Sequence, residues 1–170
     1  RLMRNFGFQG YDNVVHPGTN GKMIEVCAAM GLTNLDNYED VVTCNKRVHA
    51  SYVDAMAVVA GVSVLAYDPD EQNSHHYVVM EIDSACTGMR DQIIIALQAE
   101  NVLARKYFWP GAHKMQPYRD LFPHAELMLP NTKRIAESVI VLPTGITLPG
   151  EAIQTISDIV RTVVSTESKA

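Results

Sequence analysis

A glycine-rich segment near the N-terminus carries two side chains that could bind an anion. Residues 7–21 contain four glycines, with Asn20 near their end and Lys22 directly after them. A side-chain amide in such a loop can donate to a phosphate oxygen while neighbouring backbone N–H groups approach the same anion. A lysine there would act as a point charge. The alternatives are that Asn20 only accommodates a left-handed turn and that Lys22 is a solvated residue at a helix start.

An aromatic run in the second half of the chain is the other candidate for ligand binding. Tyr107, Phe108 and Trp109 are consecutive, and Arg105 and His113 flank them. Aromatic rings offer flat apolar surfaces and their neighbours offer hydrogen-bond donors, a combination typical of small-molecule sites. The alternative is that the rings pack in a core where a strand runs into a loop, which we favour for Phe108.

Composition and charge argue against several other classes of protein. The 170 residues are 47% apolar and 19% charged, with a formal net charge of −5 and no basic stripe of the kind that binds nucleic acid. The apolar runs are too short to span a bilayer, and the first residues lack the apolar core of a signal peptide. The three cysteines form no CxxC pair, so we expect neither a zinc site nor a disulfide framework. We expect four of the histidines outside the aromatic run to be surface or locally hydrogen-bonded residues without metal spacing; these are His16, His49, His75 and His124.

Apolar periodicity predicts the elements that position the two segments. Apolar residues from Met23 to Met30 predict a short helix that Gly31 ends, and a long helix is expected over residues 36–60, capped by Asn34 or Asp36 and stopped by Gly61. Strands are then predicted at residues 62–67, 77–82, 102–105 and 139–142, and helices at 90–100, 131–138 and from Pro149 onward. Residues 107–130 should be mostly loop.

This order of elements predicts an α+β fold, in which a small antiparallel or mixed sheet is backed by helices and preceded by a Gly-rich loop and a long helix. The last helix should bury Ile153, Ile156, Val160 and Val163. At the other end, Leu2, Met3 and Phe6 are typical of a helix's last turn, with Gly7 ending it. Since the chain opens in this way and without a methionine, we expect it to be part of a longer protein.

Three strings together resemble the DegT/DnrJ/EryC1/StrS family of sugar aminotransferases. The first runs from Asn5-Phe6-Gly7 through Pro17–Met23 to Gly31-Leu32, and is similar to the family's N-H-G and P-G-x-N-x-R-M-x-E-x-x-A-A-x-G-L. The second, from Arg105 to Pro117-Tyr118, is similar to R-x-Y-F-x-P…H…P-Y, and the third is Val141-Leu142-Pro143. Phe6 replaces the family's common His, Gly21 a common aromatic residue and Lys22 a common Arg.

The resemblance implies the C-terminal part of a fold type I enzyme that uses pyridoxal 5′-phosphate and works as a homodimer with active sites at the interface. It implies that residues 1–33 are the tail of the large cofactor-binding domain and residues 34–170 the small domain. The cofactor lysine should lie upstream, because none of the six lysines here has the family's cofactor-lysine context; they are Lys22, Lys46, Lys106, Lys114, Lys133 and Lys169. We therefore expect no catalytic residue in this chain, and no activity from it alone.

The same resemblance assigns roles to the two candidate segments. Asn20 would reach the cofactor phosphate of the partner subunit, and Lys22 could meet a cofactor or substrate phosphate. A nucleotide-linked sugar needs flat surfaces for base and sugar and donors for its diphosphate. The residues expected to supply these are Arg105, Tyr107, Trp109 and His113.

The predicted function is transfer of an amino group from an amino acid, usually glutamate, to a nucleotide-linked keto-sugar, such as a dTDP-linked 4-keto-6-deoxyhexose. One alternative is a sugar dehydratase of the same family, in which a histidine replaces the cofactor lysine. Another is a non-catalytic domain that only dimerises or binds a nucleotide. We expect a cytoplasmic protein that binds no metal, nucleic acid or membrane.

Overall fold

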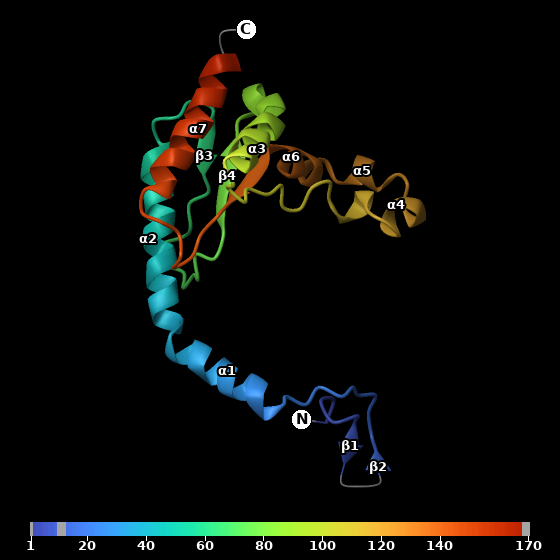
Figure 1. Ribbon diagram of the computed structural model, residues 1–170. Helices are drawn as coiled ribbons and strands as arrows, with labels where there is room; N and C mark the ends of the chain where they lie inside the picture. Colours follow the sequence, from blue (N-terminus) through green and yellow to red (C-terminus); the bar gives the residue numbers. More distant parts are fainter. Residues whose placement is uncertain (1, 10–12, 168–170) are drawn as a thin grey trace. The chain divides into compact units, whose positions relative to one another are not determined.

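The computed structural model describes residues 2–9 and 13–167, which fall into two compact units (Figure 1). The first unit is Arg1–Asp40 and the second is Val41–Ala170. The sequence prediction placed the domain boundary after residue 33, and the functional meaning of that boundary stays a prediction. No helix in the described ranges is long and apolar enough to cross a membrane.

The first unit begins with a turn and a short hairpin. β1 (Phe8–Gln9) pairs antiparallel with β2 (Asn13–Val14), so that Phe8 lies opposite Val14. Before β1, the Gly7 N–H donates to the Leu2 carbonyl at 2.9 Å, a bond across five residues that is frequent at helix ends. Leu2–Arg4 themselves form turns, in place of the predicted helical turn.

Helix α1 (Glu25–Asp36) continues through Gly31, so the prediction that Gly31 ends it is wrong. A glycine inside a helix lowers its stability but keeps the backbone hydrogen bonds, and nothing lies within 4 Å of the position of a Cβ at Gly31. Within the described ranges α1 has no buried residue. Its exposed apolar side chains are Val26, Met30, Leu32 and Leu35.

Helix α2 (Tyr38–Met56) is shorter at both ends than the sequence predicted. Asn34 and Asp36, the expected caps, lie inside α1. Past Met56 the chain turns and reaches Gly61, whose φ of 78° is the left-handed conformation that glycine adopts without strain. The buried face of α2 holds Asn45, Val48, His49, Tyr52 and Met56.

The second unit is built on a three-stranded antiparallel sheet in the order β3–β4–β5. β3 (Val62–Val64) pairs with β4 (Val78–Ile82), and β4 pairs with β5 (Val139–Leu142). β4 and β5 match the predicted strands closely, whereas β3 is shorter than residues 62–67. The strand predicted at 102–105 is wrong except for one residue, because only Arg105 pairs, in an isolated bridge with Val141.

Helices cover this sheet and complete the core (Figure 1). The 3₁₀ segment η1 (Ser84–Met89) leads into α3 (Arg90–Ala99), which packs against α7 (Ala152–Glu167). Asn101 follows α3 with φ 59°, the predicted left-handed cap. The core side chains that are at most 2% exposed are Tyr52, Met56, Val78, Met80, Ile82, Ile93, Leu97, Ala104, Ile140, Leu142, Ile156 and Val160.

Helix α7 differs from its prediction at two points. It begins at Ala152 rather than Pro149, because Gly150 disfavours helix directly after the proline and a turn precedes the first helical residue. Its core positions include Ile153, Ile156, Val160 and Val164, at spacings of three and four residues. Val163, which was expected in the core, is only partly buried.

Residues 107–130 form short helical turns rather than a plain loop. These are η2 (Ala112–Lys114), α4 (Tyr118–Leu121) and α5 (Ala125–Met128), and α6 (Pro130–Ser138) follows them into β5. The Glu126 carboxylate in α5 holds the Nζ atoms of Lys114 at 2.9 Å and Lys133 at 3.0 Å. One glutamate thus joins η2, α5 and α6.

Candidate functional site

The glycine-rich loop is held in shape by backbone hydrogen bonds to the residues that precede it. Phe6 donates to the Thr19 carbonyl at 3.1 Å, and Thr19 donates to the Met3 carbonyl at 2.9 Å. Asn20 forms an isolated antiparallel bridge with Asn5. The backbone on both sides of Asn20 is therefore fixed, while Asn20 itself stays exposed.

Two glycines make this loop possible by allowing backbone segments to approach closely. A Cβ at Gly7 would lie 1.6 Å from the His16 carbonyl oxygen, and one at Gly18 would lie 2.3 Å from the Gly7 nitrogen. Gly7 also has φ 80°, a conformation that L side chains rarely adopt. Gly7 and Gly18 therefore serve close packing of the backbone.

A small pocket of roughly 320 Å³ lies in the first unit, and its lining is rich in hydrogen-bond donors. Arg4, Asn5 and Lys22 supply its polar part, and Leu2 and Phe8 its apolar part. The Lys22 Nζ atom lies 5.3 Å from the centre of the Phe6 ring. Two cations and an amide suit a phosphate or carboxylate group.

Arg4 and Asn5 are the residues of this pocket that sequence reasoning missed. Asn5 was part of the family-like string, but neither residue has spacing that marks it as a ligand. They come into the pocket because the Gly21 N–H donates to the Arg4 carbonyl at 2.8 Å and because Asn20 pairs with Asn5.

In the second unit the structure brings Arg105 and Tyr107 together. The Arg105 Nη1 atom donates to the Tyr107 hydroxyl at 2.5 Å, and the guanidinium carbon lies 5.5 Å from the ring centre. The Tyr107 ring stacks on Phe108, with centroids 4.8 Å apart. Phe108 is 72% exposed, so the core-packing role favoured for it is wrong. Phe108 lies in a turn that follows the Arg105 bridge, outside the sheet.

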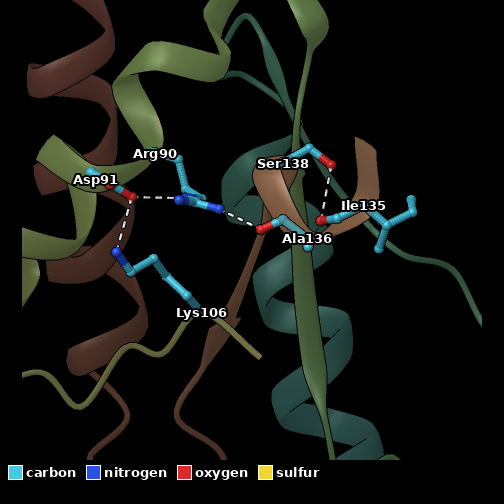
Figure 2. Close-up of polar contacts among 6 residues, drawn as sticks. All are labelled: Arg90, Asp91, Lys106, Ile135, Ala136 and Ser138. Carbon is cyan, nitrogen blue, oxygen red and sulfur yellow. Dashed lines mark hydrogen bonds and ion pairs between the residues drawn. The ribbon is translucent and has the colours of Figure 1, made fainter. Parts of the chain in front are cut away.

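Trp109 is 46% exposed and lies beside two cations. The Lys106 Nζ atom is 4.5 Å and the Arg90 guanidinium carbon is 5.8 Å from the indole centre. Both cations contact the Asp91 carboxylate, as Figure 2 shows. Hydrogen bonding from Arg90 is the main cause that lowers the pKa of Asp91, and Lys106 acts in the same direction. Sequence reasoning missed Arg90 and Asp91, which belong to the start of α3.

His113 is partly buried and sits against Gly111. A Cβ at Gly111 would lie 2.7 Å from His113 Cε1, so the glycine provides the space for the imidazole. The His113 Nε2 atom is buried and has no hydrogen-bond partner among the described residues. A buried ring nitrogen without a protein partner is a candidate for a hydrogen bond to a ligand group or an ordered water.

A separate group of rings surrounds His75 in the connection between β3 and β4. The His75 ring centre is 5.4 Å from that of His49 and 4.8 Å from that of Tyr67. His49 is buried, and its Nε2 atom lies 2.9 Å from the carbonyl oxygen of Leu65, which follows β3. Burial, and then the charges of His49 and Lys46, lower the pKa of His75.

Metal-ligating residues do not gather anywhere in residues 2–9 and 13–167 as a group of three or more His, Cys, Asp or Glu. The cysteines Cys27, Cys44 and Cys86 are free thiols. Cys27 is exposed and the other two are partly buried.

Comparison with known proteins gives one consistent result. The model of the DegT/DnrJ/EryC1/StrS aminotransferase family matches residues 1–161. The chain is 31% identical to dTDP-4-amino-4,6-dideoxy-D-glucose transaminase of Escherichia coli, over 83% of this chain and 38% of that protein. A Shigella dysenteriae protein of the same name is 26% identical over 95% of this chain and 43% of its own length.

The solved structure of DesI, determined in the presence of its TDP-sugar product, is similar to 99% of this chain with 41% identity and a TM-score of 0.86. The match covers 42% of the DesI chain. This chain thus spans about two fifths of the length of these relatives. The resemblance noted from the sequence is confirmed, and so is the small mixed fold of helices and short sheets.

Proposed function

The chain belongs to the DegT/DnrJ/EryC1/StrS aminotransferase family, and from that premise we propose that it is the C-terminal portion of a nucleotide-sugar aminotransferase. The intact protein would move an amino group from glutamate to a dTDP-linked 4-keto-6-deoxyhexose. The observation that carries the proposal is the 41% identity to DesI over 99% of this chain. The two transaminases named above, both of dTDP-4-amino-4,6-dideoxy-D-glucose, support the same choice of sugar.

Pyridoxal 5′-phosphate is the cofactor implied by the family, and the donor set of the first unit fits its phosphate. Lys22 and Arg4 supply positive charge and Asn5 an amide, without an acidic side chain among the residues that line the pocket. Asn20, exposed on a fixed backbone, is proposed to donate to the cofactor phosphate of the partner subunit. When bound, the cofactor would supply the electron-withdrawing ring that makes amino transfer possible.

The aromatic segment of the second unit is proposed to bind the nucleotide-linked sugar. Tyr107 and Trp109 offer ring surface to the base and sugar, and the exposed fraction of Trp109 leaves room for such contact. Arg105 supplies a charge for the diphosphate. The unpartnered Nε2 atom of His113 would accept from a sugar hydroxyl, or donate to a hydroxyl or phosphate oxygen, according to the tautomer.

In this proposal the chain contributes binding rather than bond-making. None of its lysines has the context of the family's cofactor lysine, which is proposed to lie in the part of the protein outside these residues. We therefore expect the 170-residue chain to be inactive alone and the intact protein to act as a homodimer.

The test uses the intact protein with its cofactor, glutamate and dTDP-4-keto-6-deoxyglucose. We expect equal amounts of 2-oxoglutarate and an amino-sugar nucleotide, identified by mass spectrometry. A deoxygenated sugar without new nitrogen would instead indicate the dehydratase. Nucleotide binding without turnover would indicate the non-catalytic domain.

A substitution tests the proposed role of Asn20. Asn20→Ala should weaken cofactor retention in the dimer by about 1–3 kcal/mol, the usual cost of removing a hydrogen-bond partner from a buried polar group. Asn131→Ala, at an exposed position in α6, is the matched control and should leave retention unchanged. Retention of the cofactor by both variants at the wild-type level would remove Asn20 from the site.

A further inference from the structure

One carboxylate oxygen joins two cations at the start of α3. Asp91 Oδ1 lies 2.8 Å from Arg90 Nε and 3.3 Å from Lys106 Nζ (Figure 2). Arg90 is 5% exposed and also donates through Nη1 to the Ala136 carbonyl of α6. The Arg90 charge is thus fixed between α3 and α6, and Asp91 connects it to the segment after residue 105.

Both cations that Asp91 holds lie beside the same indole. Lys106 and Trp109 belong to one turn, in which the main-chain N–H of Trp109 donates to the Lys106 carbonyl at 2.7 Å. That bond fixes the backbone of the turn. It does not by itself fix the side chains of Lys106 and Trp109, which need further contacts. A cation within about 6 Å of an indole centre is attracted to the ring face, so a fixed cation restricts the ring.

We propose that Asp91 is a positioning residue for Trp109: it anchors Lys106 and Arg90, which hold the indole in the orientation that a nucleotide-sugar ligand meets. The part of this inference that concerns the ligand rests on the proposed function above. Asp91 acts through Lys106 and Arg90, whose charged groups it contacts. It thereby joins the packed body of the second unit to its candidate binding segment.

Trp109 is the sole tryptophan of the 170-residue chain, so its fluorescence reports this indole directly. We expect Asp91→Asn to raise the acrylamide quenching rate and to lower the fluorescence anisotropy of Trp109. Lys106→Met should do the same, and it leaves the Arg90–Asp91 pair intact, so it remains informative if Asp91→Asn folds poorly. Asp158→Asn is the matched control, since Asp158 is also ion-paired, to Arg161, and its side chain has the same 53% exposure as that of Asp91.

The intact enzyme supplies the second readout. Asp91→Asn and Lys106→Met should raise the KM for the nucleotide sugar about two- to fivefold, the effect of one weakened cation–ring contact. The kcat and the KM for glutamate should stay at the wild-type level, and Asp158→Asn should change none of these values. A purely structural role for Asp91 would instead reduce the amount of folded enzyme, and hence the apparent kcat, without changing the KM for the nucleotide sugar.

The two readouts separate failure of this inference from failure of the proposed function. Unchanged Trp109 quenching in both variants would overturn the positioning role whatever the enzyme does. Changed quenching with an unchanged KM for the nucleotide sugar would overturn the link between Trp109 and the ligand. An intact wild-type protein without nucleotide-sugar activity would refute the proposed function, and the fluorescence result would still decide whether Asp91 positions the indole.

Discussion

The first and the second unit of this chain are stabilised by different kinds of interaction. In the described residues, the buried apolar side chains of the core all come from Val48 onward, in the second unit. Helix α7 shows the difference most clearly, because Ile156 and Val160 are at most 1% exposed, whereas α1 of the first unit buries none of its residues. The second unit is therefore stabilised mainly by removal of apolar surface from water.

The first unit depends on backbone geometry instead. Main-chain hydrogen bonds join residues 2–7 to residues 19–21. Glycines in this loop allow the backbone segments to approach closely. Such a structure places donors such as Asn20 and Lys22 accurately but gains little from burial. Truncation of buried side chains should therefore damage the second unit most, whereas the first unit should be most sensitive to a Cβ added at its loop glycines Gly7 and Gly18.

The largest effect is expected from the core of the second unit. Ile156→Ala should lower the free energy of unfolding by about 2–5 kcal/mol, because it removes buried methyl groups and leaves a cavity between α7 and the rest of the core. Urea unfolding followed by far-ultraviolet circular dichroism measures this loss. Ile95→Ala is the control: Ile95 is also helical but is 67% exposed, and it should change stability by less than about 0.5 kcal/mol. Equal losses from the two variants would contradict the assignment of the core.

A smaller, local effect is expected in the first unit from Gly7→Ala. The new Cβ would clash with the His16 carbonyl, and φ at this position would become strained, so the loop should be destabilised by about 1–3 kcal/mol. Amide hydrogen exchange measures the change at Val15, whose N–H donates to the Gly7 carbonyl at 3.0 Å. The unfolding of the second unit should not change.

Gly31→Ala is the matched control for Gly7→Ala. Gly31 lies inside α1, and nothing lies within 4 Å of the position that an added Cβ would take. Alanine should therefore stabilise that helix by about 0.5–1 kcal/mol. Slower exchange in α1 together with faster exchange at Val15 would support the contrast between a helical and a loop glycine. Faster exchange of α1 in Gly31→Ala would mean that this glycine has a packing role that the structure does not show.

The sequence predicts best the elements of the second unit that have both a clear period and a local stop signal. Val78–Ile82 alternates buried and partly buried residues, and α3 has its apolar face followed by Asn101. Prediction fails where tertiary contacts decide. The strand expected at 102–105 forms only the Arg105 bridge, and β3 ends at Val64, although the Leu65 N–H still donates to the Val79 carbonyl at 2.8 Å.

The residues of the candidate sites also divide into those that local sequence predicts and those that only tertiary packing brings together. Lys106 and Trp109 are neighbours within one turn, and the family-like strings already singled out Trp109 and His113. Arg90 and Asp91 could not be found in this way, because α3 reaches the aromatic segment only after the sheet and helices have packed. The pocket residue Arg4 likewise depends on the backbone pairing of the first unit.

The smallest effect is expected at His75, in the connection between β3 and β4 of the second unit. His75 lies in a loop with φ 48°, and its N–H donates to the Asn73 side chain at 2.8 Å rather than to a strand. Burial, His49 and Lys46 lower its pKa below the usual 6.5, so the folded chain binds fewer protons than the unfolded chain between the two pKa values. The contribution of His75 to stability is therefore present above pH 6.5 and is lost as the pH falls through the folded-state pKa.

His75→Asn tests this contribution without changing the backbone preference, because asparagine also tolerates a left-handed conformation. Urea unfolding should show a smaller loss of unfolding free energy for the variant than for the wild type as the pH falls from 8 to below 6.5. His124→Asn, at an exposed histidine of the second unit, should keep the wild-type dependence. Parallel curves for all three proteins would show that the ring cluster around His75 does not oppose its protonation.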